Sequence, residues 1–470
     1  MKFPNKETYF LEQDASFEYW QTEVIRYQKR FSKQPENTWL LFEQDSYLFS
    51  ILFFALLTAN KKIVLPQNGQ VLQIEQSMQH ADIFVGSQPS EKIPHFDLTP
   101  RSQADYSSTS NKADSVREIE FSQDSQIIFF TSGSSGTPKA VSKTIGQLLL
   151  EVDTLERTFC DLNCNSFESI VFMSTVSHQH IYGLLFKLLW PIWMGHDVYL
   201  KTFQYPEHLV HKIKQYPNKR IQLISSPAYY HRLVNDNLLI QIKSQLSALF
   251  SSGGPLKNDV ALQILSELDQ APYEVFGSTE TGGIAWRKTE SHTDDYWQLF
   301  ENIKCRIEDK TDRLSILSPY TSYDQKNVNN EWFVTDDRAE MIQNNLQDKN
   351  QRFKLLGRAD RIVKIEEKRC SLDEIQTKLV EHEWIKQVYV LTTGGTKGKR
   401  LSTAAIIELS DSGKKILETS TKFKFDQQLK SYLKGYFEPI VVPRKFRHLK
   451  NLPFNSQGKL NKLQLEALFD

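Results

Sequence analysis

The sequence predicts an α/β fold in which a large N-terminal α/β domain precedes a small C-terminal α+β domain. Short apolar runs that suit strands alternate with helix-length amphipathic segments over most of the chain. Such alternation is typical of a sheet built from crossover connections. After Gly357-Arg358-Ala359-Asp360 the chain becomes richer in Lys and Glu. We therefore expect two domains, 1–358 and 359–470.

The expected elements follow one another along the chain. Residues 47–59 are the most apolar run, and their thirteen residues fall short of the roughly twenty that span a bilayer. They predict a buried helix, which a strand at 63–66 follows, and the polar residues 102–111 predict an exposed connection. Further strands are expected at 127–130, 169–173, 197–200 and 221–224, and helices at 147–159 and 204–215. In the C-terminal domain we expect helices at 371–382 and 425–436 and strands at 386–391 and 402–408.

Charge and cysteine content exclude several classes of protein. The chain has 57 Lys and Arg against 57 Asp and Glu, so it has no overall field that would attract nucleic acid or an anionic membrane. Four cysteines, Cys160, Cys164, Cys305 and Cys370, are too few for a disulfide scaffold. Residues 1–14 lack the pattern of a signal peptide. We expect a cytoplasmic protein with buried thiols, no nucleic-acid partner and no membrane insertion.

The strongest local signal is the stretch Thr-Ser-Gly-Ser-Ser-Gly-Thr-Pro-Lys at 131–139, which follows an apolar strand-like run. Gly133 and Gly136 allow backbone N–H groups to converge on an anion, and the hydroxyl side chains add donors. Lys139 adds the positive charge that a polyphosphate requires. The stretch lacks the Walker pattern Gly-x-x-x-x-Gly-Lys-Ser/Thr. Taken alone, it is either a phosphate-binding loop or an ordinary turn.

The stretch resembles the phosphate-binding signature of the adenylate-forming (ANL) superfamily, which includes acyl- and aryl-CoA synthetases. Five later stretches resemble further motifs of that superfamily in the same order. They are 251–256 (Ser-Ser-Gly-Gly-Pro-Leu), 275–283 (Val-Phe-Gly-Ser-Thr-Glu-Thr-Gly-Gly), 331–337 (Glu-Trp-Phe-Val-Thr-Asp-Asp), 355–364 (Leu-Leu-Gly-Arg-Ala-Asp-Arg-Ile-Val-Lys) and 452–460 (Leu-Pro-Phe-Asn-Ser-Gln-Gly-Lys-Leu). The resemblance implies the ANL adenylating-enzyme fold, with a mobile C-terminal domain that carries the catalytic lysine.

The resemblance also implies a role for each matching residue. Thr279 would bind the α-phosphate, Glu280 would hold Mg²⁺, and Lys459 would reach the reacting carboxylate and the α-phosphate. Asp360 would be the pivot of the C-terminal domain. The residues implied to bind ATP or AMP are Thr131, Ser132, Gly133, Ser134, Ser135, Gly136, Thr137, Lys139, Gly253, Gly254, Pro255, Phe276, Gly277, Ser278, Asp337 and Arg358. Within this set Phe276 would stack on adenine, and Asp337 and Arg358 would contact the ribose.

Four positions depart from the family pattern. Ala140 replaces a usual Gly after the loop lysine, and Phe276 stands where Tyr is common. Asp336 replaces Gly and adds a negative charge beside the ribose acid. Glu367 stands where the family usually has Gly in a loop that lines the pantetheine channel, which puts the thiol step in doubt more than adenylation.

Residues 174–183 correspond to the segment where amino-acid-activating relatives carry an Asp for the substrate ammonium. Here the segment contains no carboxylate, so we expect an acyl or aryl acid in place of an amino acid. The acid pocket is expected to include His180, Tyr182, Gly183 and Trp286. The alternative for His178 and His180 is a pair of structural, hydrogen-bonded histidines.

These features predict an ATP- and Mg²⁺-dependent acid–thiol ligase that forms an acyl-adenylate and releases pyrophosphate. The loop around Glu367 and the segment after it resemble the stand-alone ligases of aryl-polyene and fatty-acid-like biosynthetic clusters. That resemblance implies transfer to the phosphopantetheine thiol of an acyl carrier protein that acts in trans. Two alternatives stay open: a synthetase that uses free coenzyme A, and a catalytically silent nucleotide-binding protein.

Overall fold

The computed structural model describes the backbone of residues 1–4, 8–87, 93–99, 118–132, 138–159, 170–291, 293, 295–321, 332–342, 351–365, 368–394, 401–454 and 460–469. Contacts between residues divide the chain into two compact units. The first consists of Met1–Cys305, Ile316–Phe333 and Gln343–Arg352, and the second of Arg306–Ser315, Val334–Ile342 and Phe353–Asp470. The expected domain boundary after residue 358 stays a prediction.

One sheet of the first unit carries the glycine-rich stretch at its edge. Its strand order is β5 (Ile83–Gly86), β3 (Thr38–Phe42), β4 (Lys62–Leu65), β6 (Gln126–Ser132) and β7 (Pro138–Thr144). The pairs β5–β3, β3–β4 and β4–β6 are parallel, and β6–β7 is antiparallel. Helix α3 (Val71–Met78) belongs to the crossover that leads from β4 to β5. The expected strands at 63–66 and 127–130 are confirmed as β4 and β6.

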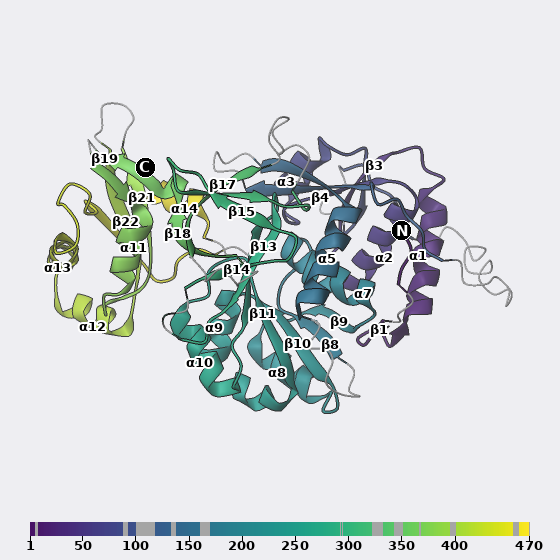
Figure 1. Ribbon diagram of the computed structural model, residues 1–470, viewed down its shortest axis with the longest axis horizontal. Coiled ribbons are helices and arrows are strands. Elements are labelled where there is room, and N and C mark those ends of the chain that lie inside the picture. Colours follow the sequence, from purple (N-terminus) through teal and green to yellow (C-terminus); the bar gives the residue numbers. More distant parts are fainter. Residues whose placement is uncertain are drawn as a thin grey trace. The chain divides into compact units, whose positions relative to one another are not determined.

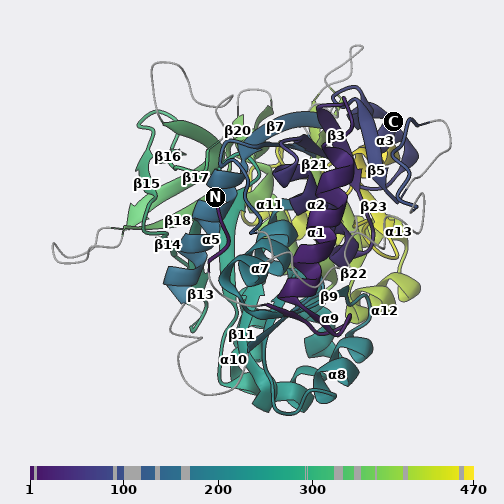
Figure 2. The same ribbon diagram turned by 90° about the vertical axis from the view of Figure 1, so that its right-hand side faces the viewer.

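Helix α2 (Ser46–Thr58) is apolar on every side because it packs inside the first unit. Its residues contact α1 (Phe17–Phe31), β3, β4 and β9 (Asp197–Thr202), and Figure 2 shows α1 beside it. The Asp45 carboxylate accepts the Leu48 N–H at 2.7 Å and caps the first turn. The Trp20 indole donates to Ser50 Oγ at 2.9 Å, which fixes α1 on α2. The buried helix expected at 47–59 is confirmed.

A second sheet of the first unit is parallel at its centre. Its order is β14 (Trp297–Leu299), β13 (Gly282–Lys288), β12 (Tyr273–Ser278), β11 (Leu246–Ser251), β10 (Arg220–Ser225), β8 (Ile170–Ser174), β9, β1 (Tyr9–Phe10) and β2 (Ala15–Ser16). Strands β9, β8, β10, β11 and β12 run parallel to their neighbours in this set, and β13 is antiparallel to β12. The expected strands at 169–173, 197–200 and 221–224 are confirmed.

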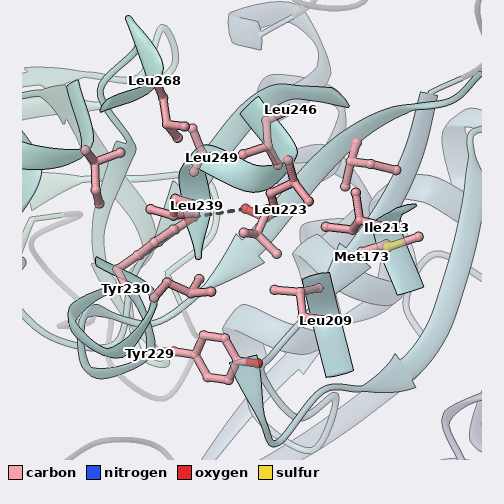
Figure 3. Close-up of a cluster of buried hydrophobic side chains, with 14 of the residues drawn as sticks. Met173, Leu209, Ile213, Leu223, Tyr229, Tyr230, Leu239, Leu246, Leu249 and Leu268 are labelled. Atoms are coloured by element: carbon pink, nitrogen blue, oxygen red, sulfur yellow. Dashed lines mark hydrogen bonds between the residues drawn. The ribbon is translucent and has the colours of Figure 1, made fainter. Parts of the chain in front are cut away.

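Helices cover both faces of this second sheet (Figure 1). Alternate strand residues such as Met173, Leu223 and Leu249 face α8 (Pro206–Lys214), α9 (Pro227–Asn235), α10 (Asn258–Leu268) and the 3₁₀ segment η3 (Leu239–Gln245). Figure 3 shows this apolar cluster. On the opposite face, Phe172 and Phe250 pack against Trp190, at ring-centroid distances of 5.2 and 5.4 Å. The alternation of buried side chains between two faces is the pattern expected of a strand covered on both sides.

The helices of that opposite face come from two stretches of the chain. They are α5 (Ile145–Phe159), α6 (Ile181–Gly183), the π-helix η2 (Leu184–Leu189) and α7 (Trp190–Met194). The helices expected at 147–159 and 204–215 are confirmed as α5 and α8. The sequence did not predict the π-helical turn or strand β7, which separates the glycine-rich stretch from α5.

The second unit combines strands with helices, as expected for an α+β domain. Strands β15 (Lys304–Ile307), β16 (Arg313–Leu317), β17 (Phe333–Ile342) and β18 (Arg352–Arg358) neighbour one another in that order, and β19 (Ile362–Ile365) pairs with β20 (Lys368–Ser371). A further sheet has the order β21 (Ile385–Thr393), β22 (Ser402–Leu409) and β23 (Lys445–Leu449). The helices are α11 (Leu372–Val380), α12 (Asp411–Thr419), α13 (Lys422–Lys434) and α14 (Lys462–Glu466). The expected C-terminal elements are confirmed as α11, α13, β21 and β22.

Two other expectations concern membranes and cysteines. In the part of the chain that the structure describes, no helix combines the length and the apolar character needed to cross a bilayer. Cys305 and Cys370 are buried, and burial raises the pKa of each thiol to about 11. Cys160, Cys164 and the polar residues 102–111 lie outside the described residues.

The apolar cluster of Figure 3 predicts unequal effects for two adjacent residues of η3. Leu239 is fully buried in the cluster, whereas 49% of Ile240 is exposed. Leu239→Ala should lower the free energy of unfolding by roughly 2–5 kcal/mol, because it leaves a cavity. Ile240→Ala should lower it by less than about 0.5 kcal/mol. Urea unfolding of both variants measures the difference, and equal losses would contradict this assignment of the core.

Candidate functional site

Neighbouring parallel strands of the second sheet end on hydroxyl residues along one edge. Strands β8, β10, β11 and β12 end at Ser174, Ser225, Ser251 and Ser278. The carboxyl ends of parallel strands are where open α/β sheets bind ligands. The Thr175 and Ser225 hydroxyl oxygens lie 2.8 Å apart at this edge. The edge therefore offers polar groups from segments far apart in the sequence.

The loop 252–256 is fixed beside β12 by two hydrogen bonds. Ser252 Oγ donates to the Val275 carbonyl at 2.8 Å, and the Leu256 N–H donates to Glu274 Oε2 at 3.2 Å. The Glu274 carboxylate also accepts two bonds from the Arg287 guanidinium, at 2.8 and 3.1 Å. The structure thus joins the predicted loop of Gly253, Gly254 and Pro255 to the strand that carries Phe276.

Glu274 is a positioning residue that the sequence analysis missed. Its side chain is 3% exposed, and it lies in the apolar run Tyr273-Glu-Val-Phe276. A carboxylate inside such a run is the signal that could have revealed it, because buried carboxylates are normally paired.

Within the loop itself, Gly253 has a φ of 87°, the left-handed region that favours glycine. Gly253, Gly254 and Pro255 are exposed. Phe276 is half-buried, and its ring lies 5.3 Å from that of Trp297. An aromatic face beside an exposed backbone loop is suited to a flat heterocycle.

The turn between β12 and β13 carries Thr279 and Glu280, and both are half-buried. The turn is closed by its own polar groups. Ser278 N–H donates to Thr281 Oγ1 at 3.0 Å, and Thr281 N–H donates to Ser278 Oγ at 3.2 Å. Gly277 lies opposite Gly283 in the strand register. A Cβ on Gly277 would lie 2.3 Å from the Gly282 carbonyl oxygen, so the hairpin requires glycine there.

The predicted phosphate loop connects the antiparallel strands β6 and β7. Thr131 pairs with Lys139 in the register of these strands, and Ser132 pairs with Pro138. Lys139 is exposed at the start of β7. Residues 133–137, and therefore Gly133, Ser134, Ser135, Gly136 and Thr137, lie outside the described residues.

The segment 174–183 contains one histidine whose role is structural. His178 is 2% exposed, and its Nδ1 lies 2.8 Å from Ser46 Oγ and its Nε2 2.9 Å from the Glu43 carbonyl oxygen. The Ser46 hydroxyl also accepts a bond from Lys187 Nζ at 2.9 Å. Burial lowers the pKa of Lys187 to about 7. The hydrogen-bonded, structural interpretation of His178 is confirmed.

The residues expected at the acid pocket lie along the opposite-face aromatic cluster. The Tyr182 hydroxyl donates to the Ser225 carbonyl at 3.2 Å, and its ring lies 4.8 Å from that of Phe186. The Trp286 ring lies 5.8 Å from both Phe159 and Tyr273. His180 is half-buried. A pocket that includes these side chains stays a prediction.

Gly183 lies at the end of α6, close to the backbone of residue 177. A Cβ on Gly183 would lie 2.0 Å from the Ser177 carbonyl oxygen. The residue therefore allows the close packing of this segment and has no side chain that could bind a substrate.

The second unit gathers the residues expected at the ribose and at the hinge. Arg358 donates to the Asp360 carboxylate at 2.8 and 2.9 Å and lies 3.7 Å from Asp337 Oδ1. Burial raises the pKa of Asp337. The extra charge of Asp336 is paired, since Arg313 donates to it at 2.7 Å and Arg358 lies 3.5 Å away. Asp336 therefore has arginine partners on two sides, although its charge still contributes to the raised pKa of Asp337.

Two residues of the predicted chemistry, Lys459 and Glu367, lie outside the described residues. Their roles stay predictions. The same holds for the function of each site residue above, although the structure places most of them.

A comparison of the chain with models of known protein families identifies its family. Residues 55–314, more than half of the chain, match the family described as "AMP-binding enzyme". The chain belongs to the AMP-binding enzyme family. Three of the six ordered motifs, at 131–139, 251–256 and 275–283, lie within this match. The ANL fold expected from the motifs is confirmed.

Curated relatives in this AMP-binding enzyme family include synthetases of different sizes. The mouse mitochondrial acyl-coenzyme A synthetase ACSM4 is 24% identical over 370 residues, which cover 73% of this chain and 60% of the relative. A putative long chain fatty acid-CoA ligase, VraA of Staphylococcus haemolyticus, is 24% identical over 73% of this chain and 70% of its own. Malpinin synthetase of Mortierella alpina is 32% identical over 115 residues, 24% of this chain and 2% of the synthetase. The chain thus matches about 60% of the length of the mouse synthetase and a small part of malpinin synthetase.

Solved structures share the fold over nearly the whole chain. ATP-bound MatB from Rhodopseudomonas palustris gives a TM-score of 0.79 at 15% identity, covering 99% of this chain and 96% of MatB. A benzoate CoA ligase from Burkholderia xenovorans gives 0.72 at 16% identity, with 99% and 97% coverage. At these identities the comparison supports the fold alone.

Gly183 and Gly254 should respond differently to the same substitution. Gly183→Ala should destabilise the protein by at least about 2 kcal/mol, because its Cβ would meet backbone atoms that cannot move away freely. Gly254→Ala should change stability by less than about 1 kcal/mol, because nothing lies within 4 Å of its Cβ position. Thermal unfolding of both variants measures the difference, and a more stable Gly183 variant would refute the close packing.

His178 predicts a loss of stability in mild acid. Burial and the nearby Lys187 ammonium lower the pKa of His178 to about 3, whereas an unfolded histidine titrates near pH 6.5. Between these values the unfolded chain binds more protons than the folded chain, so the free energy of unfolding falls as the pH drops below about 6.5. His178→Asn should therefore show a smaller decrease in Tm from pH 7 to pH 5 than the wild type. Substitution of the exposed His208 by Asn is the control, and identical slopes for all three proteins would contradict the assignment.

Proposed function

We propose that the protein activates an acyl or aryl carboxylic acid as its adenylate and transfers the acyl group to a phosphopantetheine thiol. A carboxylate oxygen attacks the α-phosphorus of ATP, the bond from that phosphorus to the oxygen bridging to the β-phosphorus breaks, and pyrophosphate leaves. The thiol sulfur then attacks the carbonyl carbon, the bond from that carbon to the AMP oxygen breaks, AMP leaves and the thiol proton passes to solvent. Membership of the AMP-binding enzyme family supports the first step.

The observation that carries the proposal is the position of β12 between two predicted nucleotide contacts. Its first residues hold the loop 252–256 through Glu274 and Val275, and its last residue leads into the turn of Thr279 and Glu280. One strand thus connects a surface suited to adenine with a turn suited to phosphate. These bonds fix residues that are 18 and 23 positions apart in the sequence relative to one another.

The turn also fits a divalent cation that a nucleotide carries. Mg²⁺ is bound by one or two carboxylates together with substrate phosphates, and Glu280 offers a carboxylate at a half-buried position. Among the described residues, no group of three or more His, Cys, Asp or Glu could hold a metal ion by itself. When bound, Mg²⁺ would supply positive charge against the phosphates.

This chain's own residues would supply the rest of the charge and the orientation. Adenylation needs charge neutralisation at the phosphates more than a general base. Lys139 and Lys459 would provide cations, and the Thr279 hydroxyl would donate to the α-phosphate. In the second unit Asp337 would accept ribose hydroxyl groups while Arg358 holds its carboxylate in place. Rotation of the C-terminal domain about Asp360 between the two steps is part of the proposal.

The acid is proposed to be acyl or aryl because the segment 174–183 offers no carboxylate to an ammonium group. The same segment contributes the half-buried His180 and Tyr182, which suit a substrate with an apolar body and a few polar groups. Relatives named as acyl-coenzyme A synthetases and the solved benzoate CoA ligase act on such acids by name. An acyl carrier protein is the proposed acceptor, and free coenzyme A is the alternative.

One assay separates these possibilities. Purified protein is incubated with ATP, Mg²⁺ and a panel of fatty, cinnamic and hydroxybenzoic acids plus L-alanine, with coenzyme A in one tube and a holo acyl carrier protein in another. Mass spectrometry should detect a thioester on the carrier with at least one acid and none with alanine. Lys459→Ala should lower the rate by roughly 100-fold, while Lys445→Ala, on strand β23, should leave it unchanged.

Other outcomes of the assay change the conclusion. Thioester on coenzyme A would assign the enzyme to the general acyl-CoA ligases. Alanine-dependent turnover would contradict the proposed acid class. Neither thioester nor AMP from any acid, with nucleotide still bound, would favour the catalytically silent nucleotide-binding protein.

A further inference from the structure

A buried lysine and a buried glutamate lie beneath the turn that carries Thr279 and Glu280. Lys143, on β7, is 1% exposed, and Glu151, on α5, is 4% exposed. Neither belongs to the motifs of the sequence analysis. Burial of a charged group is unfavourable unless the group is hydrogen-bonded or paired. Their position therefore requires a physical reason.

Lys143 connects the turn to a second segment of the first unit. Its Nζ donates to the Glu280 carbonyl at 3.3 Å and to the Tyr320 carbonyl. Both acceptors are backbone atoms, so the two bonds restrain the chain of the turn directly. One of the two bonds is made at the residue proposed to hold the cation.

Glu151 holds the other side of the same turn. Its Oε1 accepts the Gly283 N–H at 2.7 Å. The approach is close: a Cβ on Gly283 would lie 3.0 Å from Oε1, and a Cβ on Gly282 would lie 2.7 Å from Oε2. Gly282 also has a φ of 70°, a conformation that other residues rarely adopt. The two glycines thus allow the carboxylate to reach the backbone of the turn.

Further bonds attach the segment 318–321 to the turn and to α5. Ser318 Oγ donates to the Thr281 carbonyl at 3.1 Å. Gln147 Nε2 donates to the carbonyl oxygens of Pro319 and Thr321, at 3.3 and 3.0 Å. Because these bonds fix the Tyr320 carbonyl relative to α5, Lys143 has a rigid second acceptor. The turn is thus held at Glu280 and Thr281 and, where β13 begins, at Gly283.

We propose that Lys143 and Glu151 are positioning residues that fix the backbone of the Thr279–Glu280 turn against the nucleotide phosphates. The geometry of this inference rests on the contacts above. Its consequence for adenylation rests on the proposed function. An apolar pair would fill the same space without burying charge, but it would leave the Glu280 carbonyl and the Gly283 N–H without these partners. The pair therefore serves the placement of the turn more than the stability of the fold.

The test compares variants that differ in one interaction. Lys143→Met and Glu151→Met keep the length of the side chains but remove the bonds to the turn. Glu151→Gln keeps an oxygen that can accept the Gly283 N–H. Lys61→Met is the matched control, because Lys61 is also a buried lysine that donates to two backbone carbonyls, those of Gln34 and Glu36, both at 2.8 Å.

Two measurements are made on each full-length variant. Hydrogen exchange followed by mass spectrometry reports on the segment 276–286, and acid-dependent ATP–pyrophosphate exchange reports on adenylation. In Lys143→Met and Glu151→Met we expect amide exchange in this segment to rise at least about tenfold. We also expect kcat to fall about 100-fold while KM for the acid changes less than about threefold. Glu151→Gln and Lys61→Met should stay within about threefold of the wild type in both measurements.

Unchanged amide exchange at 276–286 in both Met variants would overturn the inference. So would an equal loss of kcat in Lys61→Met, since it would show a general effect of removing a buried lysine. If the wild type activates no acid, the proposed function fails and the hydrogen exchange alone decides the positioning role. Where a Met variant does not fold, Ser318→Ala replaces it, because it removes the hydroxyl that donates to the Thr281 carbonyl and accepts the Tyr320 N–H, and so loosens the second acceptor of Lys143. The same rise in exchange supports the inference, and its absence overturns it.

Discussion

The buried carboxylate of Glu274 is the contact on which the candidate nucleotide site depends. It accepts the Leu256 N–H from the loop 252–256, two bonds from Arg287 on the neighbouring strand and the Thr289 hydroxyl at 3.3 Å. Loop, strand β12 and strand β13 are therefore fixed by one side chain. The Arg287 side chain is only 10% exposed. Loss of the Glu274 carboxylate would therefore leave a buried guanidinium without its closest partner, which is unfavourable. Phe276, two residues further along β12, takes its position from this junction.

Much of the fold could be predicted because apolar runs determine it directly. The helix α2 was predicted because its run is apolar on every side and too short for a membrane, and β8, β9 and β10 were predicted because strands covered on both faces are nearly continuous in apolar residues. Strand β7 was not predicted. Its residues Lys139-Ala-Val-Ser-Lys-Thr144 are mostly polar, and it exists because it pairs with β6, a tertiary interaction that local sequence does not report.

The candidate site was predicted where its motifs are local and missed where its support comes from a distance. The loop 252–256 and the turn at Thr279 were found because their glycines and hydroxyl residues are contiguous. Lys143 was missed although a signal exists. Val141 and Ile145 are two residues before and after it, and both are buried. In a strand, residues spaced by two lie on the same face, so this spacing directs the lysine inward. Burial of that ammonium lowers its pKa to about 8. A charged residue at an apolar position of an alternating pattern is thus informative about the site.

Asp336 illustrates how one departure from the family pattern is accommodated by another residue. The carboxylate is held by Arg313 on the adjoining strand, whose guanidinium also donates to the Thr335 carbonyl at 2.7 Å. A chain with glycine at position 336 lacks the carboxylate that this arginine contacts at 2.7 Å. The two positions are therefore coupled electrostatically: without the acid Arg313 loses the carboxylate that it contacts, and without the arginine Asp336 keeps its charge beside the predicted ribose acid but loses that contact.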